Sequence, residues 1–320
     1  MSVSASRNER SIDATAVAHA LARRARQAQG ACWLHAEVAR RMAERLAVIR
    51  VQPERIIDWW PGWGGTGSLL TQTYPRAHLL AVEPNLDWLV RTQAALPSTW
   101  WPPSRWTRRA WQWVLEADVW AHDGAPPLEV DALAHGGAQL LWANMMLHAV
   151  ADPPALMARW HQLLTVDGFV MFSCFGPDTL RELRPLYAQQ GWQAPQADFV
   201  DMHDLGDMLV HAGFADPVMD QERLTLTWPD PRALLNEVRE WGGNAAPHRF
   251  GGLRTPRWQR RLMAALQTLA NSEGRLPLTV EVVYGHAFKA PPKIAVRSES
   301  TVSLEDMRGM VRRPRTTDRA

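Results

Sequence analysis

The segment from Asp58 to Gly67, DWWPGWGGTG, holds an acid and four glycines at a point where a strand is expected to give way to a helix. Gly62, Gly64 and Gly67 match the spacing G-x-G-x-x-G, and Glu83 follows Gly62 by 21 residues. Glycines allow a backbone to pass close to a nucleotide, and a carboxylate after the next strand can accept hydrogen bonds from both ribose hydroxyls. The pattern predicts a nucleoside-binding site that contains Asp58, Gly62, Gly64, Gly65, Gly67 and Glu83.

The glycine loop alone does not choose between a nicotinamide dinucleotide and S-adenosyl-L-methionine. A dinucleotide needs a second mononucleotide half, and the chain has no second glycine-rich turn. Asp118 and Asp123 precede a later strand, where either could accept the adenine amino group of a single nucleoside or remain a solvated loop acid. The chain therefore favours S-adenosyl-L-methionine, with Asp118 as its adenine contact, while a dehydrogenase stays a rival that rests on the glycine spacing.

The elements that must position this loop read as a parallel α/β sheet. Residues 13–49 have a helical period, and strand, glycine loop, helix and strand follow in that order. Asn144 ends a later strand, where α/β sheets bind ligands, and is assigned to the cofactor site. The expected strands are 56–60, 77–84, 138–144, 169–175, 224–228 and 278–289, with helices at 153–164, after Pro177 and at 204–214, and a mainly helical cap over 229–276.

In one segment the apolar residues follow neither a helical nor a strand period. Residues 86–128 mix prolines, basic residues and tryptophans, and are interpreted as a partly structured insertion. We expect the pair Trp100 and Trp101 to pack against the tryptophans of the glycine loop. The resulting division is a helical lead-in over 1–50, a catalytic domain over 51–289 and a basic tail over 290–320, which is either disordered or a docking segment.

Composition excludes several classes of function. Thirty-five Lys and Arg against 33 Asp and Glu give no global field for nucleic acid. Cys32 and Cys174 are too few for a disulfide framework and lack the spacing of metal ligands. We therefore expect no metal. No apolar run is long enough to span a membrane, so we expect a cytoplasmic protein. A transit peptide in the Arg-rich first 29 residues stays open, although Glu9 and Asp13 count against it.

Downstream motifs resemble a known family. WANMMLHAVADPPALMARWHQLLTVDGFVMFSCFGPDTLRELR, residues 142–184, is similar to the malonyl-acyl carrier protein O-methyltransferases of biotin synthesis. DMHDLGDMLVHAGF, LTLTW and LTVEVVYGHAFK follow in the family's order, and WLHAEVARRMAERL resembles its helical lead-in. The resemblance covers about residues 30–289, and FGPDTLRELR with EVVYGHAFK is far more specific than a glycine loop.

The resemblance implies a fold and a reaction. The fold would be that of class I, Rossmann-like methyltransferases, a mainly parallel seven-stranded sheet with a helical cap insertion. The reaction would move a methyl group from S-adenosyl-L-methionine to the free carboxylate of a malonyl thioester, on acyl carrier protein or on coenzyme A. A carboxylate needs no general base, so a donor that positions it is the main requirement. The candidate donors are His148, Arg181, Arg184, His203, Tyr284 and His286.

Each candidate donor also has a structural interpretation. Arg181 and Arg184 could be solvated charges on a helix, and His203 with Asp204 could cap one. Tyr284 and His286 alternate on a strand, so they could equally face the core.

The glycine loop departs from the family pattern. The family carries a compact D-x-G-x-G-x-G, whereas the span from Asp58 to Gly67 is three residues longer and Trp63 stands at a glycine position. A positive φ there would strain a Trp. An alternative alignment through Gly62 and Gly64 turns Trp59, Trp60 and Trp63 outward or against the insertion. The altered loop also suits a repurposed or cofactor-impaired protein, such as a hydroxylase-like assembly factor.

Overall fold

The computed structural model describes residues 12–27, 32–95, 111–115 and 137–291, and one compact unit ends at Ala290. Its first half contains α1 (Ala14–Gln27), α2 (Trp33–Arg45), η1 (Leu46–Val48), β1 (Arg55–Trp59), α3 (Pro61–Gly64), α4 (Leu69–Thr73), β2 (His78–Glu83), α5 (Leu86–Ala95), β3 (Trp111–Leu115) and β4 (Ala138–Ala143). Its second half contains η4 (Leu147–Ala149), α7 (Pro153–Leu163), β5 (Leu164–Phe175), α8 (Leu183–Gln189), α9 (Met202–His211), β6 (Ala215–Trp228), α10 (Pro231–Glu240), α11 (Pro256–Gln267) and β7 (Leu276–Phe288).

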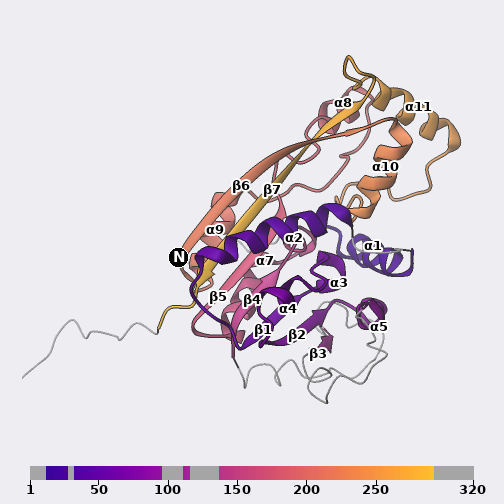
Figure 1. Ribbon diagram of the computed structural model, residues 1–320. Helices are drawn as coiled ribbons and strands as arrows, with labels where there is room; N and C mark the ends of the chain where they lie inside the picture. The colour runs from indigo at the N-terminus through magenta and orange to yellow at the C-terminus, as the bar shows by residue number, and fades with distance from the viewer. Residues whose placement is uncertain (1–11, 28–31, 96–110, 116–136, 292–320) are drawn as a thin grey trace, which may run out of the picture. The chain divides into compact units, whose positions relative to one another are not determined.

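Within the described residues, seven strands form one sheet in the order β3-β2-β1-β4-β5-β7-β6 (Figure 1). The first five strands in this order pair in parallel. β7 runs antiparallel to both β5 and β6. The mainly parallel seven-stranded sheet that the sequence predicted is therefore confirmed.

The predicted strands all form, but three of them are longer than expected. β5 starts at Leu164 rather than at residue 169, with a positive φ of 63° at Asp167 and an irregular register opposite β4. β6 runs from Ala215 to Trp228, and β7 already begins at Leu276. The hydrophobic alternation predicted these two strands too short, because pairing between β6 and β7 continues beyond the alternating residues.

The interpretation of residues 86–128 as an insertion is partly wrong. Its start forms the helix α5, and residues 111–115 form β3, which pairs in parallel with β2 and completes the sheet. The predicted packing of Trp100 and Trp101 and the adenine contact of Asp118 lie outside the described residues, as does Asp123.

Two buried clusters cover the two faces of the sheet, because consecutive side chains of a strand point to opposite sides. Ile56 and Leu140 belong to one cluster, with Leu34 and Val38 of α2. Their neighbours Ile57 and Leu141 belong to the other cluster, which also contains residues of α1, α7 and α9. The helical lead-in is therefore part of the core, as its period of apolar residues indicated.

The two most specific sequence motifs, FGPDTLRELR and EVVYGHAFK, are hydrogen-bonded to each other. Glu281, in the EVVYGHAFK motif on β7, is buried and accepts a hydrogen bond from the backbone N–H of Asp178 at 2.8 Å. Thr179 Oγ1 donates to the Glu281 carbonyl at 2.9 Å and accepts from its N–H at 3.1 Å. A Cβ at Gly176 would lie 2.6 Å from the Glu281 carboxylate. FGPDTL is thus a turn fitted to Glu281, and the helix expected after Pro177 begins only at Leu183.

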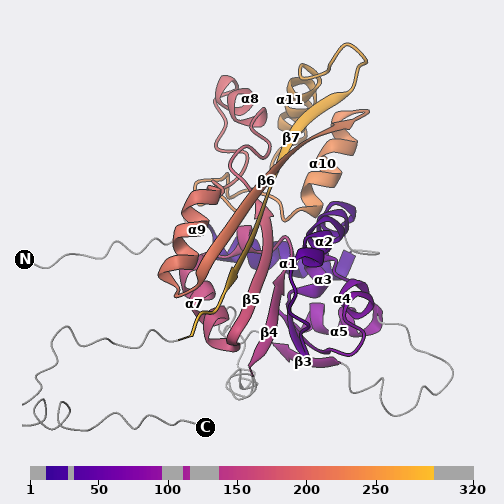
Figure 2. The ribbon, with the colours of Figure 1, turned by 60° about the vertical axis from the view of Figure 1, so that its left-hand side comes forward.

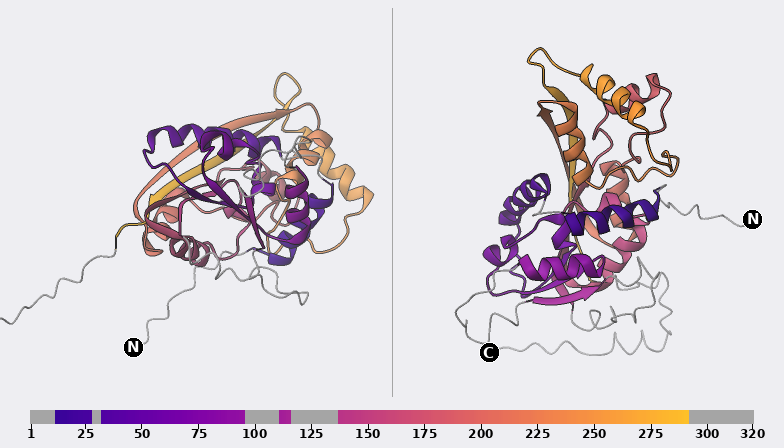
Figure 3. Two further views of the ribbon diagram at one scale, coloured as in Figure 1. Left: turned by 60° about the horizontal axis from the view of Figure 1, so that its bottom comes forward. Right: turned by 90° about the vertical axis from the view of Figure 1, so that its right-hand side faces the viewer.

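The cap forms as predicted from helices between β6 and β7, and α8 joins it (Figures 2 and 3). Asp230 caps α10 by accepting from the N–H groups of Arg232 and Ala233, and Thr255 caps α11. The rings of Trp192, after α8, and Trp258, on α11, lie 5.3 Å apart. The cap packs beside the far ends of the two antiparallel strands.

Candidate active site

The strand order places a crevice at the carboxyl ends of β1 and β4. The sheet grows from β1 toward β2 on one side and toward β4 on the other. Ligands of open α/β sheets bind at such a reversal, beside the loops that follow the strands. The residues after β1, β2 and β4 are therefore the candidate site.

The loop after β1 turns sharply into α3. Trp60 adopts a left-handed conformation with a φ of 57°, which is rare for a bulky residue, and Pro61 then starts the helical turn. Gly65 and Gly67 have φ values of 71° and 53°, which glycine adopts without a Cβ clash. The backbone strain that the sequence suggested for Trp63 therefore falls on Trp60.

Gly62 and Gly64 are required by the protein's own packing. A Cβ on Gly62 would lie 2.3 Å from Thr92 Oγ1 and 3.0 Å from Glu83 Oε1. A Cβ on Gly64 would lie 2.7 Å from the carbonyl oxygen of Asn144. The loop is thus pressed against the ends of β2 and β4, which brings the predicted residues Glu83 and Asn144 beside it.

Two carboxyl groups lie under the loop. Glu83 accepts hydrogen bonds from the Gly62 N–H at 2.9 Å and from Thr92 Oγ1 at 2.6 Å, and Asp58 accepts from Thr66 Oγ1 at 3.3 Å. Burial raises the pKa of Glu83 to about 7, and burial together with the nearby Glu83 raises the pKa of Asp58 well above its usual value. Among the described residues, Glu83 Oε2 and Asp58 Oδ2 have no hydrogen-bond partner.

Asn144 joins the loop to α2 and to β5. Its Nδ2 donates to the carbonyl of Gly64 at 2.5 Å and to that of His35 at 2.8 Å. Its Oδ1 accepts from Ser173 Oγ at 2.7 Å, and Ser173 in turn accepts from the Met145 N–H. The side chain of Asn144 therefore fixes the loop position instead of pointing freely into the crevice.

Trp63 fills the crevice between the two sides of the site. Its indole N–H donates to the carbonyl of Met145, just after β4, at 2.9 Å. Its ring lies 6.2 Å from the ring of Trp88, which follows β2, and 5.5 Å from that of His35. The sequence predicted Trp59, Trp60 and Trp63 outward or against the insertion. All three are buried, so none of them faces outward, and Trp63 packs against Trp88 of the segment that was interpreted as the insertion. The buried location follows because the three added residues fold inward as α3.

A cavity of about 40 Å³ remains beside Trp63. Small-molecule sites usually have about 300 to 1,000 Å³. His148 lines this cavity, and its ring packs 4.5 Å from that of Phe175. The other lining residues come from α1, from the segment 196–199 and from the end of α10 with the residues after it: Val17, Ala20, Leu21, Ala149, Gln196, Ala197, Phe199, Trp241, Gly242, Gly243 and Ala245.

The other predicted donors do not line this cavity. Arg181 is about half exposed and contacts Asp178 at 3.4 Å, and Arg184 donates to the carbonyl of Pro177. His203 is 80% exposed and pairs with Asp201, the N-cap of α9; the cap therefore involves Asp201 and not Asp204, which the structural interpretation had named. His286 is half-buried on β7 near Phe288. Of the six candidates, His148 is the one that borders the crevice.

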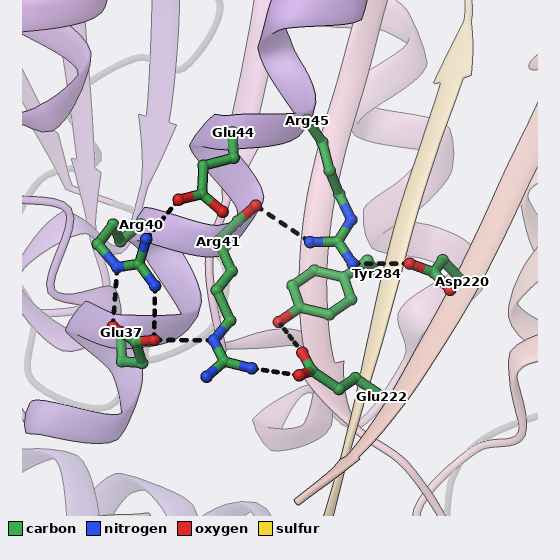
Figure 4. Close-up of polar contacts among 8 residues, drawn as sticks. All are labelled: Glu37, Arg40, Arg41, Glu44, Arg45, Asp220, Glu222 and Tyr284. Carbon is green, nitrogen blue, oxygen red and sulfur yellow. Dashed lines mark hydrogen bonds and ion pairs between the residues drawn. The ribbon is translucent and has the colours of Figure 1, made fainter.

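Tyr284 faces α2 instead of the crevice (Figure 4). Its hydroxyl donates to Glu222 at 3.3 Å, and the Arg45 guanidinium lies 3.8 Å from its ring centroid. Arg45 also pairs with Asp220 at 2.6 Å, and Arg41 pairs with Glu222. These contacts fasten α2 to β6 and β7, and burial with the nearby Glu222 raises the pKa of Tyr284 to about 12.

We expect Tyr284→Phe to lower the free energy of unfolding by about 1 kcal/mol, because one partly buried hydrogen bond is lost. Denaturant titration measures this change, with Arg40→Ala as a control in the exposed part of the same network. The rate of the methyl transfer that the sequence predicts should be the same for Tyr284→Phe and the wild type. An unchanged stability with a tenfold lower rate would instead assign the hydroxyl to the substrate.

Several residues around the crevice were not singled out from the sequence. His35 is fully buried, contacts the carbonyl of Trp63 through Nδ1 at 2.9 Å, and has a pKa lowered to about 4 by burial. Trp88 and Thr92 lie on α5, in the segment interpreted as an insertion. A helix placed after the EPN turn would have found both, since Asn85 caps it by accepting from the Trp88 N–H.

Comparison with known proteins decides the family. No family model matches the chain. A malonyl-acyl carrier protein O-methyltransferase of Gallionella capsiferriformans is 36% identical over 288 residues, which cover 90% of this chain and 94% of that relative. One of Laribacter hongkongensis is 38% identical over 260 residues, 80% of this chain and 82% of the relative. The chain belongs to the malonyl-acyl carrier protein O-methyltransferase family. The predicted resemblance is confirmed, and neither a dehydrogenase nor a repurposed protein is favoured.

Solved structures support the class I methyltransferase fold. The YcgJ protein of Bacillus subtilis superposes with a TM-score of 0.50 at 9% identity, over 80% of this chain and 99% of that protein. A protein of Bacillus halodurans C-125 gives the same TM-score at 11% identity, over 80% of this chain and all of that protein. At such identities the likeness concerns the fold alone.

The described residues contain neither of two further kinds of feature, a metal site and a membrane-spanning helix. No group of three or more His, Cys, Asp or Glu side chains there could hold a metal ion. No helix in that part of the chain is long and apolar enough to cross a membrane.

Proposed function

We propose that this protein transfers a methyl group from S-adenosyl-L-methionine to the free carboxylate of a malonyl thioester carried by acyl carrier protein, as a step of biotin synthesis in the cytoplasm. The observation that carries the proposal is the similarity to methyltransferases of this name over 94% of one relative's length. The sheet supports it, because Glu83 and the glycine loop lie at the reversal where such folds bind a nucleoside.

The polar groups of the crevice fit a nucleoside. The buried Oε2 of Glu83 lacks a partner among the described residues, and a ribose hydroxyl would supply one. The Asp58 carboxyl lies beside it, and the positive φ of Gly65 and Gly67 turns the loop toward the same end of the sheet. Glu83 would hold the ribose, and the loop would border the methionine part.

The space in the crevice does not yet fit a ligand of that size. The indole of Trp63 occupies the gap between Trp88 and Met145, and the cavity that the described residues enclose beside it has about 40 Å³. Trp63 must therefore leave this position before a nucleoside enters. The movement costs its hydrogen bond to Met145 and the burial of its ring.

The chemistry asks little of the protein beyond alignment. The bound sulfonium supplies the methyl group; the carboxylate oxygen forms the new O–C bond as the S–C bond breaks. An ionised carboxylate is already a nucleophile, so no proton has to be removed. The protein's residues must hold the carboxylate in line and exclude water, and His148 is the candidate donor because it borders the cavity.

Incubating the protein with S-adenosyl-L-methionine labelled in its methyl group and with malonyl-acyl carrier protein should give a base-labile methyl ester on the acyl group. Acetyl-acyl carrier protein, which lacks the second carboxylate, is the matched control and should remain unlabelled. Growth of a biotin auxotroph that lacks this methyl transfer tests the pathway. Absence of label on malonyl-acyl carrier protein at any concentration of both substrates would refute the proposal.

A further inference from the structure

The cap contains a long segment without acidic residues. From Trp241 to Ser272 the sequence has no Asp or Glu and five arginines, although the whole chain is nearly balanced at +2. Four of these arginines lie between Arg254 and Arg261, at α11 and its N-terminal approach. The cap therefore carries a local excess of positive charge at α11 and the residues just before it.

These four arginines have no carboxylate partner among the described residues. Arg254 instead lies 3.9 Å from the ring centroid of Phe250 and 4.2 Å from that of Trp258, and Arg261 contacts the amide of Gln190. The side chains of Arg257 and Arg260 are exposed and form no hydrogen bond with any described residue. The acids of the neighbouring α10 are already engaged: Glu237 accepts from Trp228, and Glu240 pairs with Arg24.

Apolar side chains lie within the same surface. Leu253 is 97% exposed and Phe250 is 42% exposed, both just before α11. Arg260 and Arg261 follow Arg257 by three and four residues, so both lie on the same side of the helix as Arg257, while Leu262 and Ala265 are buried beneath it. We call Phe250, Leu253, Arg254, Arg257, Arg260 and Arg261 the α11 patch. Arginine and aromatic residues around an apolar centre are typical of protein interfaces.

Two segments connect the α11 patch to the crevice: the residues after α10 and the residues before Gln196. Trp241 to Ala245 line the cavity and continue directly into the loop that carries Phe250 and Leu253. Arg254 contacts Gln193 at 3.3 Å, three residues before Gln196, which lines the cavity as well. A protein bound on the α11 patch would therefore sit beside the loops that enclose the cavity.

We propose that the α11 patch is the docking surface for an acidic carrier protein, which presents its thioester-linked acyl group to the cavity at His148. This inference rests on the proposed function, which supplies a protein-borne substrate. Charge complementarity selects the partner, since four uncompensated guanidinium groups around Leu253 match a surface of carboxylates with an apolar centre. The small extent of the patch and the net charge of +2 favour a protein over a nucleic acid.

The test compares two double variants of the full chain. Arg257→Glu with Arg260→Glu reverses two charges of the patch, whereas Arg232→Glu with Arg239→Glu makes the same change at exposed positions of α10. For the patch variant we expect a KM for malonyl-acyl carrier protein at least tenfold higher than for the wild type. Methylation of malonyl-coenzyme A, a probe without a protein surface, should be unchanged, as should both activities of the α10 variant.

An unchanged KM of the patch variant, an equal loss with malonyl-coenzyme A, or an equal loss in the α10 variant would overturn the docking proposal. Calorimetry with carrier protein that bears no acyl group separates this proposal from the proposed function. If the wild type methylates neither substrate, the function fails, and the docking surface still stands or falls on whether the patch variant binds carrier protein at least tenfold more weakly. Binding of single-stranded RNA through the patch, without any effect on carrier protein, would contradict the proposal.

Discussion

Glu83→Gln is expected to stabilise the ligand-free protein at pH 8 by about 3 kcal/mol and to weaken its binding of S-adenosyl-L-methionine by roughly 10- to 100-fold. Burial raises the pKa of Glu83 from 4.5 to about 7. The folded state therefore holds a proton that the unfolded chain releases near pH 4.5. The resulting stabilisation is complete below pH 4.5 and is lost as the pH rises through about 7.

A glutamine cannot ionise, so Glu83→Gln should remove most of this loss between pH 4.5 and 8. The free energy of unfolding should still fall somewhat with rising pH, since burial also raises the pKa of Asp58. The weaker binding follows because a neutral amide replaces charge-assisted hydrogen bonds to the ribose, each worth about 1.5 to 3 kcal/mol.

Denaturant titrations at pH 5 and pH 8 and calorimetry with the ligand measure both effects, with the exposed Glu54→Gln as control. Equal stability of wild type and Glu83→Gln at pH 8 would show that the ionised carboxylate does not lower the free energy of unfolding. Unchanged affinity would remove Glu83 from the cofactor site.

The sequence predicted the frame of the site well because the frame follows from local patterns. The apolar runs at 56–60 and 77–84 gave β1 and β2, and the acid at the end of the second run lies under the glycine loop as expected. Asn144 could be placed at the end of β4 for the same reason. Its role as a brace for Gly64 could not, because its partners His35 and Ser173 are distant in the chain.

The failures have a common physical cause in long-range packing. Tyr284 was a possible donor, and its alternation with His286 on a strand left open whether it faces the core; contacts with Arg45 and Glu222 hold it against α2. Trp63 was predicted to lie outward or against residues 86–128; it does pack against Trp88 of that segment, but its place inside the crevice was not predicted. The structure rearranges by inserting α3, whose turn carries the ring into the crevice, and no local signal specifies that direction.

Trp63→Ala is expected to lower the free energy of unfolding by about 3 to 5 kcal/mol while binding S-adenosyl-L-methionine at least tenfold more tightly than the wild type. The loss of stability follows from the buried indole, which contacts Trp88 and His35 and donates to Met145. The gain in affinity follows because the variant no longer has to move this ring out of the crevice. Thermal unfolding with and without ligand gives both quantities in one experiment.

Trp160→Ala is the matched control for this prediction. Trp160 is as deeply buried, but it lies on α7 and packs against Trp59 and Phe172, away from the crevice. The control should lose similar stability without any greater response to the ligand, because its cavity opens elsewhere in the core. If Trp63→Ala binds the ligand no more tightly than the wild type, the indole does not compete with the nucleoside. The glycine loop of this chain would then differ in sequence from the family pattern without obstructing the site that it borders.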